Sequence, residues 1–112
     1  MNKVLFVPFR GEISCLQHAL LNVLDMDSVG MTARLILEGE STRLIRELEE
    51  SNHPLYIQAK EKGLIDGICW ACSKQMGALE YNETVRIPLL SDMSGHPALA
   101  PYIQKGFQVI TL

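Results

Sequence analysis

The sequence predicts a single α/β domain in which three layers, α/β/α, surround a mostly parallel sheet of about five strands. Its 112 residues suit one core, and 47% hydrophobic with 21% charged residues is the balance of an ordinary globular protein. Short apolar runs alternate along the chain with segments whose apolar residues recur every three or four positions. Repeated strand-helix order is typical of a parallel sheet covered on both faces. We therefore expect residues 1–112 to form one domain of flavodoxin-like appearance.

The first part of the chain contains two predicted strand-helix units. Residues 4–9 are almost all apolar, as expected of a strand buried on both faces. Residues 13–27 carry apolar side chains on one helical face, and Ser14 is the expected N-cap. A second buried strand is predicted over residues 33–37, and a helix with a charged outer face follows around residues 44–48.

The middle of the chain begins with a helix break and continues to a third strand. A proline fits the first position of a helix, so Pro54 predicts a new helix that ends at Lys62. The third strand is expected over residues 64–70, and a short helix over residues 73–79. Residues 80–86 are polar and are expected to be irregular.

The last part of the chain supplies the remaining strands. Residues 87–90 are a candidate fourth strand, and a turn over residues 92–97 leads into a helix that ends at Gln104. Gly106 is the expected C-cap of that helix, and residues 107–112 form the final predicted strand. The strand-helix alternation thus extends over the whole sequence.

In a parallel sheet the carboxyl ends of the strands lie at one edge, where ligands bind. Four segments that follow predicted strands should therefore lie close together: Arg10–Cys15, Glu38–Ser41, Cys69–Ser73 and Ser91–His96. All three cysteines of the chain fall within these segments. This coincidence is the main functional signal of the sequence.

The segment Cys69-Trp70-Ala71-Cys72 is the strongest candidate for chemistry. A cysteine at a helix start can be stabilised as the nucleophilic thiolate by backbone N–H groups and the helix dipole. The CxxC spacing also allows one sulfur to attack a species bound to the other. We therefore predict Cys69 and Cys72 as catalytic residues. The alternative is that both cysteines are small buried hydrophobic residues of the core.

The same cysteines suggest a metal site as an alternative. Cys15, Cys69 and Cys72 together with His96 or His18 would form a three-cysteine, one-histidine ligand set, which tetrahedral zinc accepts. No second CxxC and no pair of closely spaced histidines follows the first CxxC, as a zinc finger or ribbon would require. The first expectation is therefore that no cofactor is needed, with zinc as the alternative.

Several other residues of this edge are candidates for binding a substrate. Arg10, Cys15 and His96 could hold or position it, and Gly95 permits a tight turn close to a ligand. Glu38 is a further charge of the edge that could contact a substrate. None of these residues belongs to a phosphate-binding motif, because the chain has neither GxGxxG nor a P-loop. A nucleotide cofactor is not supported.

Composition excludes several classes of partner. The net charge is −3 with both signs interspersed, so no basic stripe is present for nucleic acid or an anionic membrane. No apolar stretch is long enough to span a bilayer, and the first apolar run is too short for a signal peptide. We expect a cytoplasmic protein whose cysteines are reduced.

A family resemblance begins at Cys69. The cysteine at a strand end, the small residue Ala71 and Gly77 resemble the active-cysteine region of the DsrE/DsrF-like sulfur-relay family. The size of the chain and its order of strands and helices, from Val4 to Leu112, are also similar to that family. The resemblance implies an α/β/α domain, a trimer or hexamer, and a cysteine that carries sulfur as a persulfide between donor and acceptor proteins.

The resemblance assigns the sulfur-carrying role to Cys69. The family pattern usually has a small apolar residue where this chain has Cys72. A second thiol can resolve a persulfide on Cys69 and release sulfide, or relay the sulfur. The leading hypothesis is thus a sulfurtransferase-like carrier. The alternatives are a zinc-binding protein and an oligomeric interaction module without chemistry of its own.

Overall fold

A computed structural model describes residues 2–112 and confirms the predicted α/β class. Five strands form one sheet, and every strand pairing in it is parallel. The order of strands across the sheet is β4-β3-β2-β1-β5. The strands are β1 (Lys3–Val7), β2 (Thr32–Leu37), β3 (Ile65–Cys69), β4 (Leu89–Leu90) and β5 (Phe107–Thr111).

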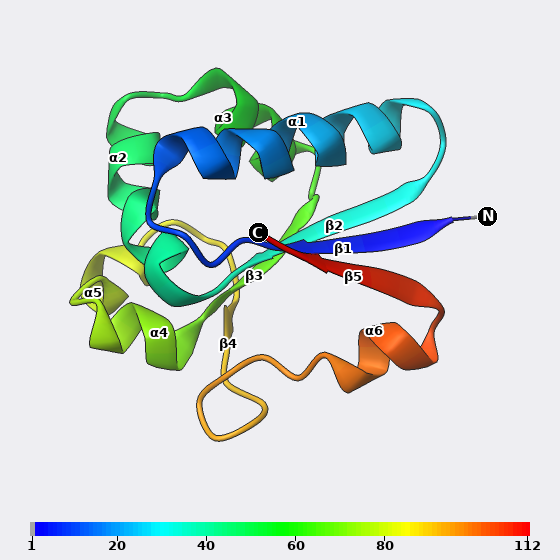
Figure 1. The fold of residues 1–112 in the computed structure, drawn as a ribbon. Coiled ribbons are helices and arrows are strands. Elements are labelled where there is room, and N and C mark those ends of the chain that lie inside the picture. Colours follow the sequence, from blue (N-terminus) through cyan, green and yellow to red (C-terminus); the bar gives the residue numbers. More distant parts are fainter. Residues whose placement is uncertain (1) are drawn as a thin grey trace.

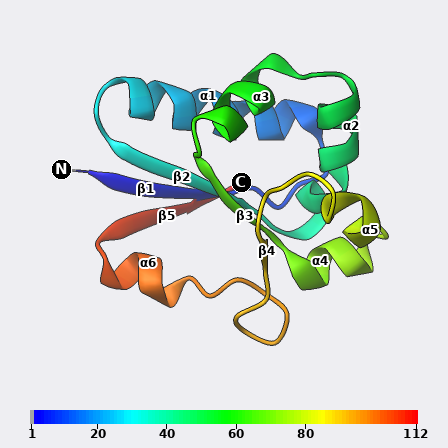
Figure 2. The ribbon, with the colours of Figure 1, turned by 180° about the vertical axis from the view of Figure 1, so that it is seen from behind.

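Helices cover both faces of this sheet and complete the three layers. Figures 1 and 2 show α1 and α3 over one face, α6 over the other, and α4 with α5 beyond the end of β3. The helices are α1 (Ile13–Ser28), α2 (Ile45–Glu50), α3 (Pro54–Glu61), α4 (Trp70–Gln75), α5 (Leu79–Asn82) and α6 (Ala100–Gln104), with a 3-10 helix, η1 (Gly39–Leu44), before α2. Within residues 2–112, no helix has the length and apolarity that crossing a membrane requires.

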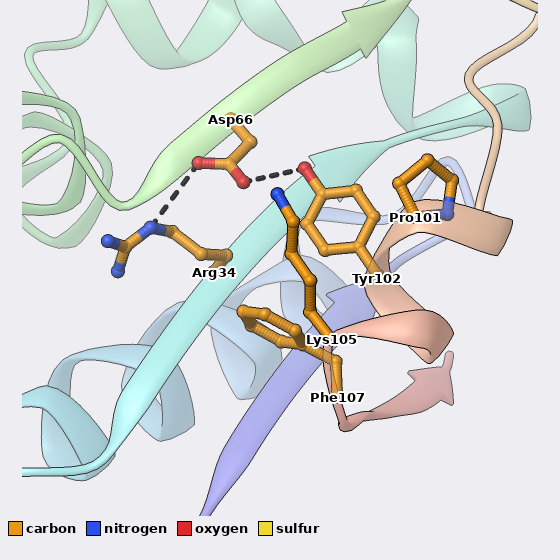
Figure 3. Close-up of a pocket in the computed structure, with 6 residues that line it drawn as sticks. All are labelled: Arg34, Asp66, Pro101, Tyr102, Lys105 and Phe107. Carbon is orange, nitrogen blue, oxygen red and sulfur yellow. Dashed lines mark hydrogen bonds and ion pairs between the residues drawn. The ribbon is translucent and has the colours of Figure 1, made fainter.

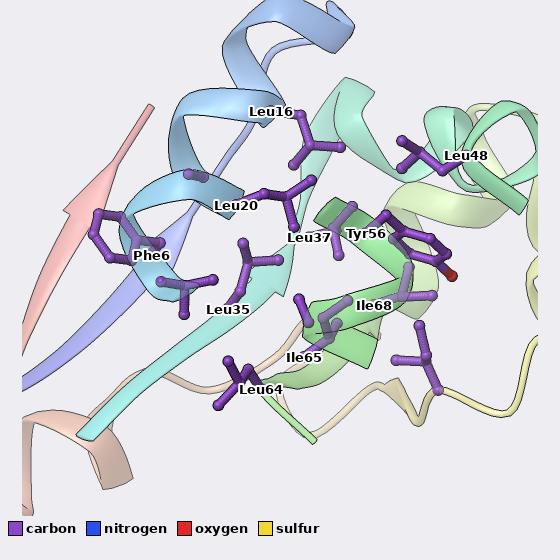
Figure 4. Close-up of a cluster of buried hydrophobic side chains, with 14 of the residues drawn as sticks. Phe6, Leu16, Leu20, Leu35, Leu37, Leu48, Tyr56, Leu64, Ile65 and Ile68 are labelled. Atoms are coloured by element: carbon purple, nitrogen blue, oxygen red, sulfur yellow. The ribbon is translucent and has the colours of Figure 1, made fainter. Parts of the chain in front are cut away.

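The larger hydrophobic core lies between the sheet and the layer of α1 and α3 (Figure 4). Successive residues of a strand point to opposite faces, so Phe6 and Leu35 reach this core while their chain neighbours point away. Leu16 and Leu20 of α1 pack onto the same face, and Tyr56 closes the core from α3. The three- and four-residue spacing in the sequence therefore marks the buried side of α1, as predicted.

The opposite face of the sheet has a smaller core under α6. Leu5, Val7 and Ile36 are completely buried there, although α6 has only five residues. Tyr102 and Phe107 meet edge to face with ring centroids 5.3 Å apart and extend this cover. Because both faces are covered, the central strands are apolar at consecutive positions rather than at alternate ones.

Several local predictions were wrong. Helix α1 begins at Ile13, so its N-cap residue is Glu12 and Ser14 already lies inside the first turn. The helix expected over residues 73–79 begins at Trp70 and ends at Gln75, because Gly77 adopts φ +69° and ends the helical path. The segment expected to be irregular begins within α5. Pro54 at the start of α3 is confirmed.

Gly67 allows the short edge strand β4 to lie close to β3. A Cβ atom at Gly67 would lie 2.4 Å from Cγ of Leu90 and 3.0 Å from the carbonyl oxygen of Pro88. Only a residue without a side chain permits this approach, since the carbonyl contact is to backbone.

We expect Gly67→Ala to destabilise the protein by about 1 to 3 kcal/mol, because β4 must move away from β3 to admit the methyl group. Urea denaturation of the variant and of the parent protein measures this loss. Gln108→Ala, at an exposed position of β5, is the matched control and should leave the midpoint nearly unchanged. Equal midpoints for Gly67→Ala and the parent would contradict the packing argument.

Candidate functional site

Four side chains from three segments converge at the carboxyl edge of the sheet. Glu38 follows β2, Cys69 and Cys72 stand at the junction of β3 and α4, and His96 lies in the turn after β4. One potential ligand atom from each of these residues lies within 4.8 Å of the others. Strands β2, β3 and β4 are neighbours in the sheet, which is why these three segments meet. We refer to these four residues as the Cys-His cluster.

The two cysteines are linked through the first turn of α4. Cys69 has extended backbone angles, φ −60° and ψ 123°, and is the N-cap residue of that helix. Its Sγ accepts a hydrogen bond from the backbone N–H of Cys72 at 3.3 Å, as a capping side chain does. Cys69 is completely buried and Cys72 is 8% exposed. The CxxC spacing thus brings both sulfur atoms to one side of the helix start.

His96 brings an imidazole to both thiols. Its Nδ1 lies 3.2 Å from Sγ of Cys69 and 3.8 Å from Sγ of Cys72. The turn that carries His96 is closed by two backbone hydrogen bonds between His96 and Met93, at 2.8 and 2.9 Å. Since a neutral thiol is a donor, Cys69 can donate its S–H to Nδ1 of His96.

Gly95 positions this turn against α4. Its carbonyl oxygen accepts a hydrogen bond of 2.8 Å from the backbone N–H of Ala71. Gly95 has φ +90°, and a Cβ atom there would lie 3.1 Å from Cβ of Ala71. The residue therefore allows the turn to approach the helix closely and so places His96 over the sulfur of Cys69.

Burial dominates the electrostatics of the cluster. Loss of hydration raises the pKa of Cys69 to about 12, and the hydrogen-bonding interaction with the Cys72 side chain, which favours the protonated Cys69 thiol, adds to the rise. The N–H of Cys72 acts in the opposite direction but is outweighed. Burial also raises the pKa of Glu38, against the attraction of His96. The helix start alone therefore does not stabilise the Cys69 thiolate as the sequence pattern suggested.

A buried polar network holds the cysteine turn in place. Ser73 Oγ donates a hydrogen bond of 2.7 Å to the carbonyl oxygen of Cys69 and accepts one of 3.0 Å from Nδ2 of Asn82. The same Asn82 amide donates to the carbonyl oxygen of Thr42 in η1 at 2.9 Å. Both Ser73 and Asn82 are completely or almost completely buried. The network thus connects the turn after β3 to the segment after β2.

The network was missed in the sequence because short-range patterns do not identify it. Asn82 lies in a polar stretch that resembles a solvated loop, and Ser73 resembles an ordinary helix residue. Glu38, which was considered only as a charge of the edge, is 8% exposed. Its carbonyl oxygen is held by Ser41 Oγ at 2.7 Å, so the backbone that carries the carboxylate is fixed.

Cys15 lies outside the Cys-His cluster. It is partly exposed and lines a shallow pocket of about 200 Å³ with Arg10, His18 and Leu112. Arg10 is engaged there in an exposed ion pair with Glu12, at 3.2 Å. The structure thus separates the predicted residues into two groups, one around Cys69 and one around Cys15.

Another pocket, of about 270 Å³, lies on the α6 side of the sheet (Figure 3). Asp66 uses both carboxylate oxygens there: it accepts a hydrogen bond of 2.6 Å from Tyr102 and forms an ion pair of 3.4 Å with Arg34. Lys105 and Phe107 complete the lining. Because Asp66 is paired with both Arg34 and Tyr102, this pocket connects α6 to the sheet and is not the preferred site for chemistry.

Comparison with known proteins adds one relative. The chain is 28% identical over 103 residues to an uncharacterized protein, MJ0733, of Methanocaldococcus jannaschii. The alignment covers 92% of this chain and 84% of the relative. No family model matches the chain, and no solved structure matches it. The description of this protein thus rests on its own fold and site: it is an α/β protein with a cluster of two buried cysteines, a histidine and a glutamate.

Removal of the amide that joins the two segments should loosen the site. We expect Asn82→Ala to lower the free energy of unfolding by about 1 to 3 kcal/mol, since it leaves buried partners of the network unsatisfied. Thermal and urea denaturation measure the loss. The exposed Asn22→Ala in α1 is the control and should cost less than about 0.5 kcal/mol. An equal effect of both variants would argue against a structural role of Asn82.

Burial of the cluster also predicts the order of thiol reactivity. At neutral pH iodoacetamide should modify Cys15 first and Cys69 last, by about tenfold or more, because the reagent needs an accessible thiolate. The rate at Cys69 should increase as the pH rises toward its pKa of about 12. Peptide mass spectrometry measures each rate, and the urea-unfolded chain should show no such order. Fastest labelling at Cys69 would contradict the burial of its thiol.

Proposed function

We propose that this protein is a sulfurtransferase-like sulfur carrier in which Cys69 accepts sulfane sulfur as a persulfide and Cys72 resolves or relays it. The observation that supports the proposal best is the position of one imidazole nitrogen 3.2 Å from the first thiol and 3.8 Å from the second. A thiol pair with a shared proton acceptor has the groups that sulfane-sulfur chemistry needs. The resemblance of the Cys69 region to the sulfur-relay family is consistent with it.

The first step is a transfer of sulfur to Cys69. Its S–H proton passes to Nδ1 of His96, and the thiolate attacks the terminal sulfur of a persulfide donor, R–S–SH. The bond between the two donor sulfur atoms breaks, and the new bond makes Cys69–S–SH. The donor leaves as the thiolate R–S⁻, which takes the proton from His96. The transfer needs no external oxidant or reductant, because the donor persulfide becomes a thiolate while the Cys69 thiolate becomes a persulfide.

The second step uses Cys72 in one of two ways. Attack of its thiolate on the outer sulfur of the persulfide relays that sulfur to Cys72. Attack on the sulfur of Cys69 itself forms a disulfide and expels HS⁻, so that two thiols are oxidised while the sulfane sulfur is reduced. The sulfur atoms lie within 4.8 Å of each other, which suits either attack after a small movement.

The buried thiol requires the donor to gain access to it. In the resting protein Cys69 is completely covered and its raised pKa keeps it protonated at neutral pH. The segment of residues 91–94 that precedes His96 is exposed on its whole length. A donor that displaces this turn would uncover Cys69, and the proton acceptor stands beside it. The thiol is then reactive only when a donor is bound.

The proposed partners are sulfur donor and acceptor proteins, and the proposed assembly is a homo-oligomer, a trimer or hexamer. Both follow from the family resemblance. Met76 after α4 and Met93 beside His96 are 37% and 57% exposed. Exposed apolar side chains next to the cluster are consistent with a protein surface meeting the site.

Incubation of the reduced protein with a sulfane-sulfur donor tests the proposal. We expect the peptide that contains Cys69 to gain one sulfur atom, because its thiolate forms the persulfide. In Cys72→Ser the persulfide should accumulate, since no second thiol resolves it, whereas the parent protein should release sulfide. Peptide mass spectrometry and a sulfide assay provide the two readouts.

Two variants make this test specific. Cys15→Ser retains the whole Cys-His cluster and should load sulfur like the parent protein. Cys69→Ser retains a side-chain oxygen that can cap α4 but should not load sulfur. If Cys69→Ser and the parent gain the same amount of sulfur, or neither gains any, the proposed carrier function is wrong.

A further inference from the structure

The donor atoms of the Cys-His cluster lie close enough together to surround one metal ion. Zinc bound by sulfur, nitrogen and oxygen at its usual bond lengths leaves its ligand atoms about 3.3 to 3.8 Å apart. In the cluster Nδ1 of His96 is 3.2 Å from Sγ of Cys69 and 3.8 Å from Sγ of Cys72. A carboxylate oxygen of Glu38 completes the set, with all separations within 4.8 Å.

The carboxylate of Glu38 indicates what this space is suited to hold. The residue is only 8% exposed, and one of its carboxylate oxygens lies within 4.8 Å of both cysteine sulfur atoms and of an imidazole nitrogen of His96. Taking a carboxylate out of water is costly, and a cation bound beside it offsets that cost. Two thiols and an imidazole complete the donor set, which is the combination of soft and nitrogen ligands that zinc prefers.

We propose that Cys69, Cys72, His96 and Glu38 form a zinc site, and that zinc and sulfur compete for the same thiols. The second half of this proposal rests on the proposed sulfur-carrier function. Binding of Zn²⁺ displaces the protons of both thiols, so that Zn²⁺ and two S–H groups give a zinc dithiolate and two H⁺. Zinc-bound sulfur shares a lone pair with the metal and is held in place, so it attacks a sulfane donor more slowly than the free thiolate does.

The cluster differs from the zinc site suggested by the sequence in one ligand. Cys15 lies in the separate pocket with Arg10 and His18, and Glu38 takes the fourth place instead. Each of the four donors is held by contacts of its own segment, such as the Ser41 bond to the Glu38 carbonyl oxygen. The ligand atoms therefore stand close together before any ion binds, which favours affinity.

Zinc titration in competition with a chromophoric chelator tests the site. We expect the reduced, metal-free protein to bind one Zn²⁺ per chain, and Co²⁺ to give the visible spectrum of a tetrahedral thiolate site. Cys69→Ser and Cys72→Ser should abolish both signals. Glu38→Gln should weaken zinc binding by about tenfold or more, since it exchanges a charged ligand for a neutral one.

Two control variants separate the cluster from its surroundings. Glu40→Gln changes a neighbouring exposed carboxylate, and Cys15→Ser removes the remaining thiol. Both should bind zinc like the parent protein. Circular dichroism of every variant establishes that it is folded. No zinc binding by the folded parent, or loss of binding in Cys15→Ser with retention in Glu38→Gln, would overturn the site.

The competition is tested by sulfur loading with and without one equivalent of zinc. We expect zinc to suppress sulfur loading at Cys69 in the parent protein and a chelator to restore it. Glu38→Gln should still load sulfur at a zinc concentration that blocks the parent, because its thiols remain free. Full loading of the zinc-saturated parent would overturn the competition. Absence of loading in metal-free protein would instead contradict the carrier function and leave the zinc titration to decide the site.

Discussion

The parallel pairing of β3 with both β2 and β4 is the constraint on which the candidate site depends. Since the three strands end at one edge, Glu38, Cys69 and His96 meet although they are distant in sequence. Gly67 allows β4 to lie close to β3, and the chain that leaves β4 forms the turn that carries His96. Burial of apolar side chains on the two sheet faces therefore holds in place the strands whose ends carry the Cys-His cluster.

Burial gives the Cys-His cluster two opposing properties. It fixes the side chains in one arrangement, but it also raises the pKa of Cys69 and of Glu38, because a negative charge loses its hydration there. In both proposals a positive charge must accompany the thiolate, either on His96 after proton transfer or on a bound metal ion. The proposed sulfur transfer and the proposed zinc binding thus depend on the same property of the cluster.

The sequence predicted the convergence at the sheet edge but not its exact membership. Apolar runs and helical spacing located the strands, and the parallel-sheet rule then placed Cys69, Cys72 and His96 on one side. Which segments are neighbours depends on the order of strands across the sheet, and local patterns do not contain that order. Glu38 follows β2, next to β3, whereas Cys15 follows β1, one strand further away. Of the four zinc ligands considered in the sequence, Cys15 therefore lies outside the cluster, and Glu38 lies inside it.

The two cysteines contribute differently to the cluster. Cys69 accepts the backbone N–H of residue 72 and so begins α4, while its sulfur faces His96. The cap alone does not require sulfur, because a serine oxygen accepts the same hydrogen bond, and commonly does so at helix starts. Cys72 supplies its N–H whatever its side chain, so its thiol is not needed to hold the turn. The structural roles at both positions are thus compatible with other residues, and it is the proposed chemistry that requires sulfur at both.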